Sequence, residues 1–272
     1  MIHEYYQFAQ NIARGAGEVT LKYFKGDFNV FTKSSASDPL TDADLASNDY
    51  LTSAIQENYP DHGIISEETD DLNPDAEFVW VLDPIDGTYN FSTSVPLYAV
   101  LVALLKNGEP IIAAQYYPAL DEMYCAYKGG GAFWNEKQIH VRKKPDLDHS
   151  FGTSSGRFKP SVSHARFISQ YLLSQKFTFG LNNFHCMAYD QALIASARRD
   201  WTIHQGAALW DYVSGALLLQ EAGATVTNLS GKPWSIEDRE MLAAHPSLHP
   251  KLLGAYQESL KEYRHYTDSK NT

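Results

Sequence analysis

The chain has 272 residues, of which 44% are hydrophobic and 20% are charged, and its formal net charge is −11. This length and composition are typical of one large globular domain or of two closely joined ones. The acidic charge argues against a nucleic-acid polymer or an anionic membrane as a partner, because both repel a negative surface. An anionic ligand would require bound cations that reverse the local field.

Two further features bear on the cellular compartment. The cysteines Cys125 and Cys186 form no CxxC pair and cannot build a disulfide framework. The first ten residues lack the basic and apolar regions of a signal peptide, and no apolar run approaches the roughly 18 residues of a membrane span. We therefore expect a cytoplasmic protein that does not bind a membrane.

The N-terminal part of the chain predicts two helices joined by a polar segment. Apolar residues recur at helical spacing over residues 2–24, and a second helix is expected over residues 43–58. Residues 27–41, between them, are rich in Gly, Asp and Ser and predict a hairpin or a mobile loop.

A run of strands follows the second helix. Short apolar segments predict strands at residues 63–65 and 77–83, and two longer ones meet at Asn107-Gly108, a hairpin signal. The three glycines at 129–131 predict a hairpin turn, because the sequence has no GxxxxGK[ST] phosphate loop. We expect these strands to form an antiparallel meander.

The remainder of the chain alternates between the two element types. Strands are expected near residues 151–154, 176–180, 200–204 and 224–228, and helices near residues 161–174, 188–198, 211–222 and 246–264. A run of strands followed by such alternation predicts an α+β fold built in layers.

We expect one domain over residues 1–272. Residues 1–150 would hold the first two helices and the antiparallel sheet, together with most of the acidic motifs described below. Residues 151–265 would form an α/β half that selects the substrate. Residues 266–272 are polar and predict a disordered tail.

Acidic side chains stand where several of these elements end or begin. Asp83 and Asp86 lie three residues apart in the segment DPIDGTYN, directly after the apolar run FVWVL. Glu67 follows a short strand, Asp211 opens a helix, and Asp44 lies in the first turn of another helix. Such positions are where α/β proteins gather their functional sites.

A cluster of these carboxylates would favour a hard metal ion. Carboxylates in one pocket repel one another, so their pKa values rise unless cations are bound. Oxygen ligands without histidine or cysteine suit Mg²⁺ or Mn²⁺ rather than zinc. Two such ions could hold a phosphate group and activate water.

Each acid also has a purely structural explanation. Asp211 could be only a helix cap, and the Asp86-Gly87 pair could be only a turn. Glu67 could lie in a solvated loop, and Asp44 could interact only with its helix dipole. No single acid decides between the two interpretations, and only their combination indicates a metal site.

Three segments carry a family resemblance. They are GIISEET (63–69), WVLDPIDGTYNF (80–91) and WDYVSGALLLQEAGA (210–224), and KSSASDPLTDAD (33–44) adds a weaker match. With these motifs the chain resembles the inositol monophosphatase family of Mg²⁺-dependent, lithium-sensitive phosphatases, over about residues 5–265. The resemblance implies a layered α-β-α-β-α sandwich of the sugar phosphatase type, and a homodimer.

The same resemblance implies two or three magnesium ions, with manganese as a possible substitute. Glu67, Asp83 and the backbone carbonyl of Ile85 would hold the first ion. Asp83, Asp86 and Asp211 would hold the second ion, so that Asp83 bridges the two. A third, weaker ion would bind near Glu67, mostly through water.

The catalytic groups implied by the resemblance are Glu67 and Thr88, which would orient the attacking water, and Asp44, which would accept a hydrogen bond from Thr88. The reaction would be direct in-line attack of metal-activated water on phosphorus, without a phosphoenzyme. Lys33 resembles a family lysine near the third ion, and a mobile surface lysine is an equally simple explanation.

The resemblance also implies substrate contacts, and the sequence departs from the family pattern at two of the positions concerned. The family pattern places the backbone N–H groups of Gly87 and Thr88 at the phosphate, and the carboxylates of Asp86 and Asp211 beside it. His185 and His204 stand at substrate-facing positions where the family usually has other residues. For both histidines, substrate contact and simple packing remain alternatives, and inositol itself is therefore uncertain as the substrate.

We therefore expect a Mg²⁺-dependent phosphomonoesterase that hydrolyses a small sugar or polyol phosphate, such as inositol 1-phosphate. Histidinol phosphate, a 3′-phosphoadenosine nucleotide and fructose 1,6-bisphosphate are alternative substrates. A non-catalytic regulator that binds a phosphorylated ligand is the alternative from a different functional class.

Overall fold

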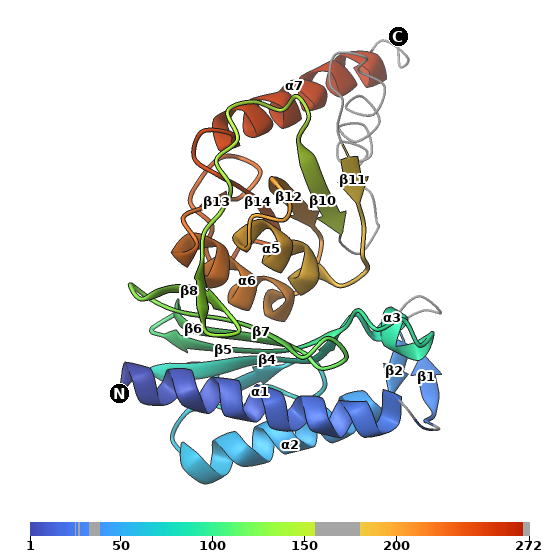
Figure 1. Ribbon diagram of the computed structural model, residues 1–272, viewed down its shortest axis with the longest axis vertical. Coiled ribbons are helices and arrows are strands. Elements are labelled where there is room, and N and C mark those ends of the chain that lie inside the picture. The colour runs from blue at the N-terminus through green and yellow to red at the C-terminus, as the bar shows by residue number, and fades with distance from the viewer. Residues whose placement is uncertain (25, 27, 33–38, 156–179, 269–272) are drawn as a thin grey trace.

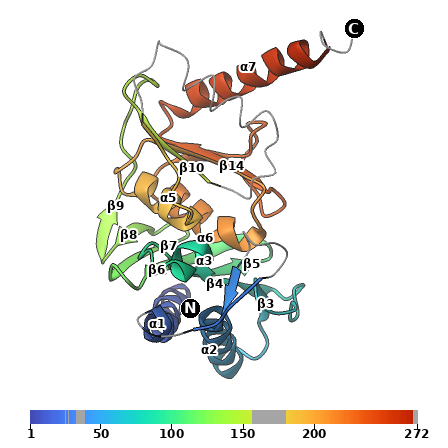
Figure 2. The same cartoon turned by 90° about the vertical axis from the view of Figure 1, so that its right-hand side faces the viewer.

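The computed structural model describes residues 1–24, 26, 28–32, 39–155 and 180–268, whose elements stack in layers (Figure 1). Helices and sheets alternate from one end of the molecule to the other, as the second view also shows (Figure 2). The helices that form layers are α1 (Ile2–Phe24) with α2 (Asp42–Asn58), α5 (Met187–Ala195) with α6 (Leu209–Glu221), and α7 (His249–Asp268). This α+β sandwich confirms the predicted α-β-α-β-α order.

Helices α1 and α2 cover the outer face of the first sheet and begin within one residue of their predicted starts. The start of α2 is fixed by a capping box, in which Thr41 Oγ1 accepts from Asp44 N (3.4 Å) and the Asp44 carboxylate accepts from Thr41 N (2.7 Å). In the part of the chain that the structure describes, no helix is long and apolar enough to cross a membrane.

The first sheet has seven strands in the order β3-β4-β5-β6-β7-β8-β9. The strands are β3 (Gly63–Ser66), β4 (Phe78–Asp86), β5 (Ala99–Lys106), β6 (Glu109–Tyr117), β7 (Glu122–Tyr127), β8 (Gly131–Trp134) and β9 (Lys137–Ile139). All neighbours from β4 onward pair antiparallel, but β3 is parallel to β4. The expected meander is wrong at that pair, because residues 67–77 return the chain to the edge where β3 begins.

The second sheet has five strands in the order β11-β10-β12-β14-β13. They are β10 (Phe151–Ser155), β11 (Gly180–Asn182), β12 (Trp201–Gln205), β13 (Thr225–Thr227) and β14 (Glu240–Ala244). β14 was not expected from the sequence, since its apolar part is too short to stand out. It pairs antiparallel with β12 and β13, and so joins them into one sheet.

Some predicted boundaries shift in the second half. α5 ends three residues before its predicted end, where Ala197 adopts a left-handed backbone (φ 62°) that a helix cannot continue. α7 continues to Asp268, so the expected disordered tail is wrong for residues 266–268. The helix expected over 161–174, most of the strand expected at 176–180, and Lys33 lie outside the described residues.

The predicted polar segment between α1 and α2 contains a hairpin, β1 (Val30–Thr32) with β2 (Pro39–Thr41). The glycine-rich turn between β7 and β8 is also a hairpin, as predicted. There the backbone N–H groups of Gly129 and Gly131 each donate to the Glu221 carboxylate at 2.8 Å. This contact joins the first sheet to the end of α6.

Candidate metal centre and active site

Strand β4 carries the first acid of the site toward the middle helical layer. Along the strand, Val79 and Val81 pack in the core that contains α5 and α6, whereas Trp80 and Leu82 pack in the core under α1 and α2. Side chains alternate between the two faces of a strand. Asp83 therefore continues the face that points toward α6.

An irregularity then turns the second acid to the same face. Asp83 lies opposite Leu101 of β5, and Asp86 lies opposite Ala99, so that the register shifts between them. Three steps along β4 thus match two along β5, which is the geometry of a β-bulge. Leu101 and Ala99 both face the core that contains α5 and α6, and Asp86 joins Asp83 on that face.

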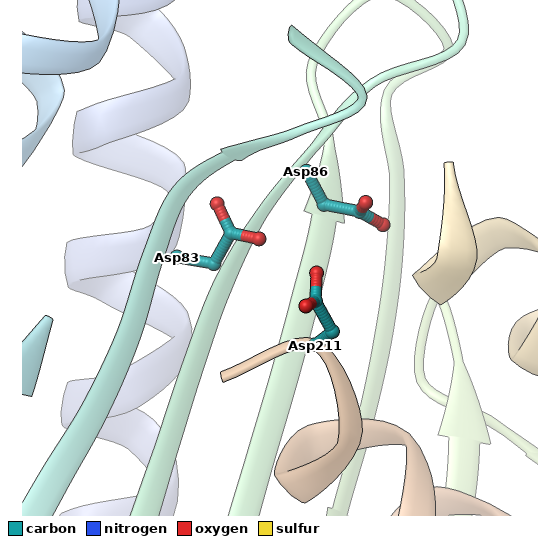
Figure 3. Close-up of side chains that lie close together, drawn as sticks. All are labelled: Asp83, Asp86 and Asp211. Carbon is teal, nitrogen blue, oxygen red and sulfur yellow. The ribbon is translucent and has the colours of Figure 1, made fainter. Parts of the chain in front are cut away.

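Asp211 completes the cluster from the first turn of α6. One carboxylate oxygen from each of Asp83, Asp86 and Asp211 lies within 4.8 Å of the other two (Figure 3). Asp211 Oδ2 also accepts a hydrogen bond from Ala208 N at 2.7 Å. The capping role considered for Asp211 is therefore real, and it coexists with a place in the cluster.

The electrostatics of the cluster favour a cation. Burial raises the pKa of Asp83, and the negative charges of Glu67, Asp86 and Asp211 raise it further. Burial also raises the pKa of Asp86, although hydrogen bonds from neighbouring donors oppose this shift. A group of three acids with only oxygen ligands fits a hard divalent ion, which would relieve their repulsion.

Glu67 lies at the end of β3, beside Asp83. The parallel register pairs Ser66 with Leu82, so the residues that follow them are neighbours, and Glu67 N donates to Leu82 O at 3.3 Å. In the described residues, the group of three close carboxylates does not include Glu67. Its charge nevertheless raises the pKa of Asp83.

The remaining predicted catalytic groups meet at the start of α3 (Thr88–Ser92). Thr88 Oγ1 lies 3.4 Å from Asp44 Oδ1, the contact that the resemblance implies, and 2.9 Å from the Ile85 carbonyl oxygen. Gly87 has a left-handed backbone (φ 94°), and a Cβ there would lie only 3.0 Å from Leu97 O. Glycine is therefore required at this position.

The N-terminus of α5 holds Asp86, a feature that sequence reasoning missed. Asp86 accepts hydrogen bonds from Met187 N (3.1 Å), Ala188 N (2.6 Å) and Cys186 Sγ (3.3 Å). Burial raises the pKa of the Cys186 thiol, and the Asp86 charge raises it further, so the thiol is a neutral donor. No local pattern signals this contact, because its partners are about 100 residues apart.

The two histidines at the predicted substrate positions have opposite environments. His204 has no exposed surface, and its ring nitrogens lie 3.1 Å from Ser155 Oγ and 2.7 Å from Thr202 Oγ1. His185 is exposed, and its ring centroid lies 6.1 Å from that of Tyr89. The geometry favours packing for His204 and solvent contact for His185, and both substrate roles stay predictions.

Comparison with known proteins identifies the family of the chain. Residues 1–261 match the model of the inositol monophosphatase family. The inositol-1-monophosphatase of Bacillus subtilis is 30% identical over 260 residues, which cover 94% of this chain and 97% of the relative. The Nus factor SuhB of Pasteurella multocida is 31% identical over 255 residues, which cover 92% and 94% of the two chains.

A solved structure shares the fold as well. The inositol monophosphatase of Anabaena (Nostoc) sp. PCC 7120 superposes with a TM-score of 0.81 and is 30% identical, with coverage of 94% of this chain and 96% of that one. The family match spans nearly the whole chain, including the three motifs and the acids they carry. The chain belongs to the inositol monophosphatase family and is a phosphoric monoester hydrolase.

Proposed function

We propose that the protein is a Mg²⁺-dependent phosphatase that hydrolyses a small phosphorylated sugar or polyol. The observation that carries this proposal is the group of three carboxylates, Asp83, Asp86 and Asp211, with oxygens within 4.8 Å of one another. The relatives named inositol-1-monophosphatase support inositol 1-phosphate as the first substrate to test.

The three aspartates would hold a Mg²⁺ ion, and Glu67 with the Ile85 carbonyl would contribute to a second one. When bound, magnesium neutralises the charge of the phosphate group and makes water more acidic. The support in the molecule is electrostatic, since burial and mutual repulsion raise the pKa values of Asp83 and Asp86. Mn²⁺ has the same preference for oxygen ligands and is an alternative ion.

Thr88 and Glu67 orient the attacking water in this proposal. The Thr88 hydroxyl donates its proton toward Asp44 Oδ1 or the Ile85 carbonyl, which leaves its oxygen free to accept a hydrogen bond from water. Glu67 accepts a proton from the same water. The water oxygen bonds to phosphorus, the ester P–O bond breaks, the leaving alkoxide takes a proton from solvent water, and Glu67 returns its proton to solvent.

An aromatic surface is available to contact the leaving alcohol of the substrate. Beside the cluster stands an exposed ring pair, Tyr89 and His185, whose planes are inclined by 42°. Aromatic faces of this kind can stack on a planar group as well as on a sugar. Histidinol phosphate and a 3′-phosphoadenosine nucleotide therefore stay in the panel of candidate substrates, together with fructose 1,6-bisphosphate.

The proposal is tested by phosphate release from this panel, with Mg²⁺, with EDTA, and with Mg²⁺ plus lithium. We expect release from at least one substrate that requires Mg²⁺, is restored by Mn²⁺ and is inhibited by lithium. Release that continues in EDTA would contradict the metal dependence. Absence of release from every substrate would contradict the proposed phosphatase.

A regulatory function is the second candidate, because several similar proteins carry the name Nus factor SuhB. Under this alternative the same fold would bind a phosphorylated ligand or a protein partner without turnover. Ligand binding measured by calorimetry in the absence of phosphate release would favour it. The predicted homodimer is tested by light scattering of the purified protein.

A further inference from the structure

Cys186 occupies a helix cap position but does not cap its helix. It precedes α5 with an extended backbone (φ −147°), and its thiol makes no regular capping hydrogen bond, although the Tyr189 amide in the first turn lowers the pKa of the thiol. Ser, Thr, Asp and Asn are the residues that stabilise such positions, and cysteine is not among them. Cysteine is therefore at best a weak cap for α5, and capping alone does not account for it.

The Cys186 thiol instead points from the start of α5 toward Asp86, at the end of β4 in the first sheet. Cys186 Sγ lies 3.3 Å from Asp86 Oδ2, and both groups are buried. The backbone amides of Met187 and Ala188 donate to the two oxygens of the same carboxylate. An ionised carboxylate only accepts hydrogen bonds, so the thiol is the donor in this contact.

The space around the thiol is small. A Cβ built on Gly87, the residue after Asp86, would lie 3.2 Å from the Cys186 Cβ. The two backbone segments therefore pack closely at this point. A serine has the same shape with a shorter bond to its donor atom, so it fits this space and can still donate.

We propose that Cys186 is a positioning residue for the metal centre, which fixes the orientation of the Asp86 carboxylate through its thiol. The inference rests on the proposed function only in requiring that Asp86 bind a metal ion. Groups that hydrogen-bond to a metal ligand fix its orientation, and their removal typically weakens metal binding about 10- to 100-fold. A thiol is a weak donor, which places Cys186 near the lower end of that range.

Direct metal binding to the intact protein tests this role without a substrate. Binding of Mg²⁺ is measured by calorimetry, and binding of Mn²⁺ by electron paramagnetic resonance, for Cys186→Ala and Cys186→Ser. We expect the Kd of Cys186→Ala to rise about tenfold, and that of Cys186→Ser to stay within about twofold of the original protein. Rescue by serine separates hydrogen bonding from packing.

The other buried cysteine is a matched control. Cys125 lies in β7, and its Sγ is 2.9 Å from the Tyr6 hydroxyl in the core under α1. Cys125→Ala also removes a buried thiol, and it is expected to lower thermal stability without changing metal affinity. A similar loss of metal affinity in Cys125→Ala would show that any buried cavity weakens the site, and would overturn the assignment.

A spectroscopic measurement covers the case in which Cys186→Ala does not fold. The infrared S–H stretching band of Cys186, identified by its loss in Cys186→Ser, is expected to shift when Mg²⁺ is added, while that of Cys125 stays fixed. An unshifted Cys186 band, or equal metal affinity in all variants, would overturn the proposal. Metal binding without phosphate release would contradict only the proposed phosphatase.

Discussion

Two carboxylates connect the seven-stranded sheet to the helices above it, and they differ in their surroundings. Asp86, on the sheet, accepts hydrogen bonds from the N-terminus of α5, and Glu221, on α6, accepts them from the Gly129 and Gly131 amides. Asp86 lies close to two other acids, Asp83 and Asp211, whereas Glu221, in the part of the chain that the structure describes, accepts hydrogen bonds only from the backbone of the glycine turn. A carboxylate that only accepts hydrogen bonds, as Glu221 does, connects two layers of the structure. A metal site needs further acids beside it, as Asp86 has.

The largest effect is expected from Asp83→Asn. Loss of a direct metal ligand should lower Mg²⁺-dependent phosphate release by more than about 100-fold, since loss of indirect support alone costs 10- to 100-fold. Glu221→Gln is the control, because it makes the same chemical change in a carboxylate outside the cluster. Phosphate release by Asp83→Asn at the original rate would contradict the metal role of Asp83.

Asp83→Asn, which should reduce activity, should increase the folding stability of the protein when metal is absent. The folded-state pKa of Asp83 is raised, so the folded state binds more protons than the unfolded state, and stability falls as pH rises above the unfolded pKa. In EDTA at pH 7.5, Asp83→Asn should be more stable than the original protein, because the neutral amide avoids ionising a buried carboxyl group beside other acids.

Urea unfolding in EDTA measures this difference. It should shrink as the pH is lowered toward the unfolded pKa of an aspartate, near 4. Mg²⁺ at neutral pH should stabilise the original protein and have little effect on Asp83→Asn. A stability difference that does not change with pH would show that the substitution acts through packing rather than through charge.

A smaller effect is expected at the second carboxylate. Glu221→Gln weakens two charge-assisted hydrogen bonds and should cost about 1 kcal/mol of stability. Hydrogen exchange should accelerate at the Gly129 and Gly131 amides, while the affinity for Mg²⁺ stays unchanged. Reduced metal affinity in this variant would show that the contact of Glu221 with the glycine turn also supports the metal site, and would contradict its purely structural role.

The smallest functional effect is expected from His204→Gln. The ring of His204 is buried against Ser155 and Thr202, so its loss should reduce stability by about 1–3 kcal/mol. Relative kcat/KM values for inositol 1-phosphate and the other candidate substrates should remain the same. A changed substrate preference would place His204 at the substrate, the alternative that the sequence left open.

Local patterns predicted most of the fold and the acids of the site. Residues 2–24 form a helix as predicted, and the hairpin turn at Asn107-Gly108 joins β5 to β6. Asp83 and Asp86 could be identified because both lie in one short motif at the end of an apolar strand. In each case the signal lies within a few consecutive residues.

The features that were missed depend on residues far apart in the sequence. The parallel pairing of β3 with β4 depends on the path of residues 67–77, and β14 is a strand because β12 and β13 offer it partners. The contact of Cys186 with Asp86 spans 100 residues. Burial of His204 likewise depends on the neighbouring strand, which the sequence around His204 does not reveal.

The irregularity in β4 explains why the two motif acids stand three residues apart. In a regular strand, residues three apart point in opposite directions, and Asp86 would face the apolar layer of α1 and α2. The extra residue of the bulge between Asp83 and Asp86 turns the Asp86 side chain to the other face of the sheet. The two acids therefore share one face although they are three residues apart. A regular strand with the same three-residue spacing would keep both acids in the sequence but place them on opposite faces of the sheet, and the metal site would be lost.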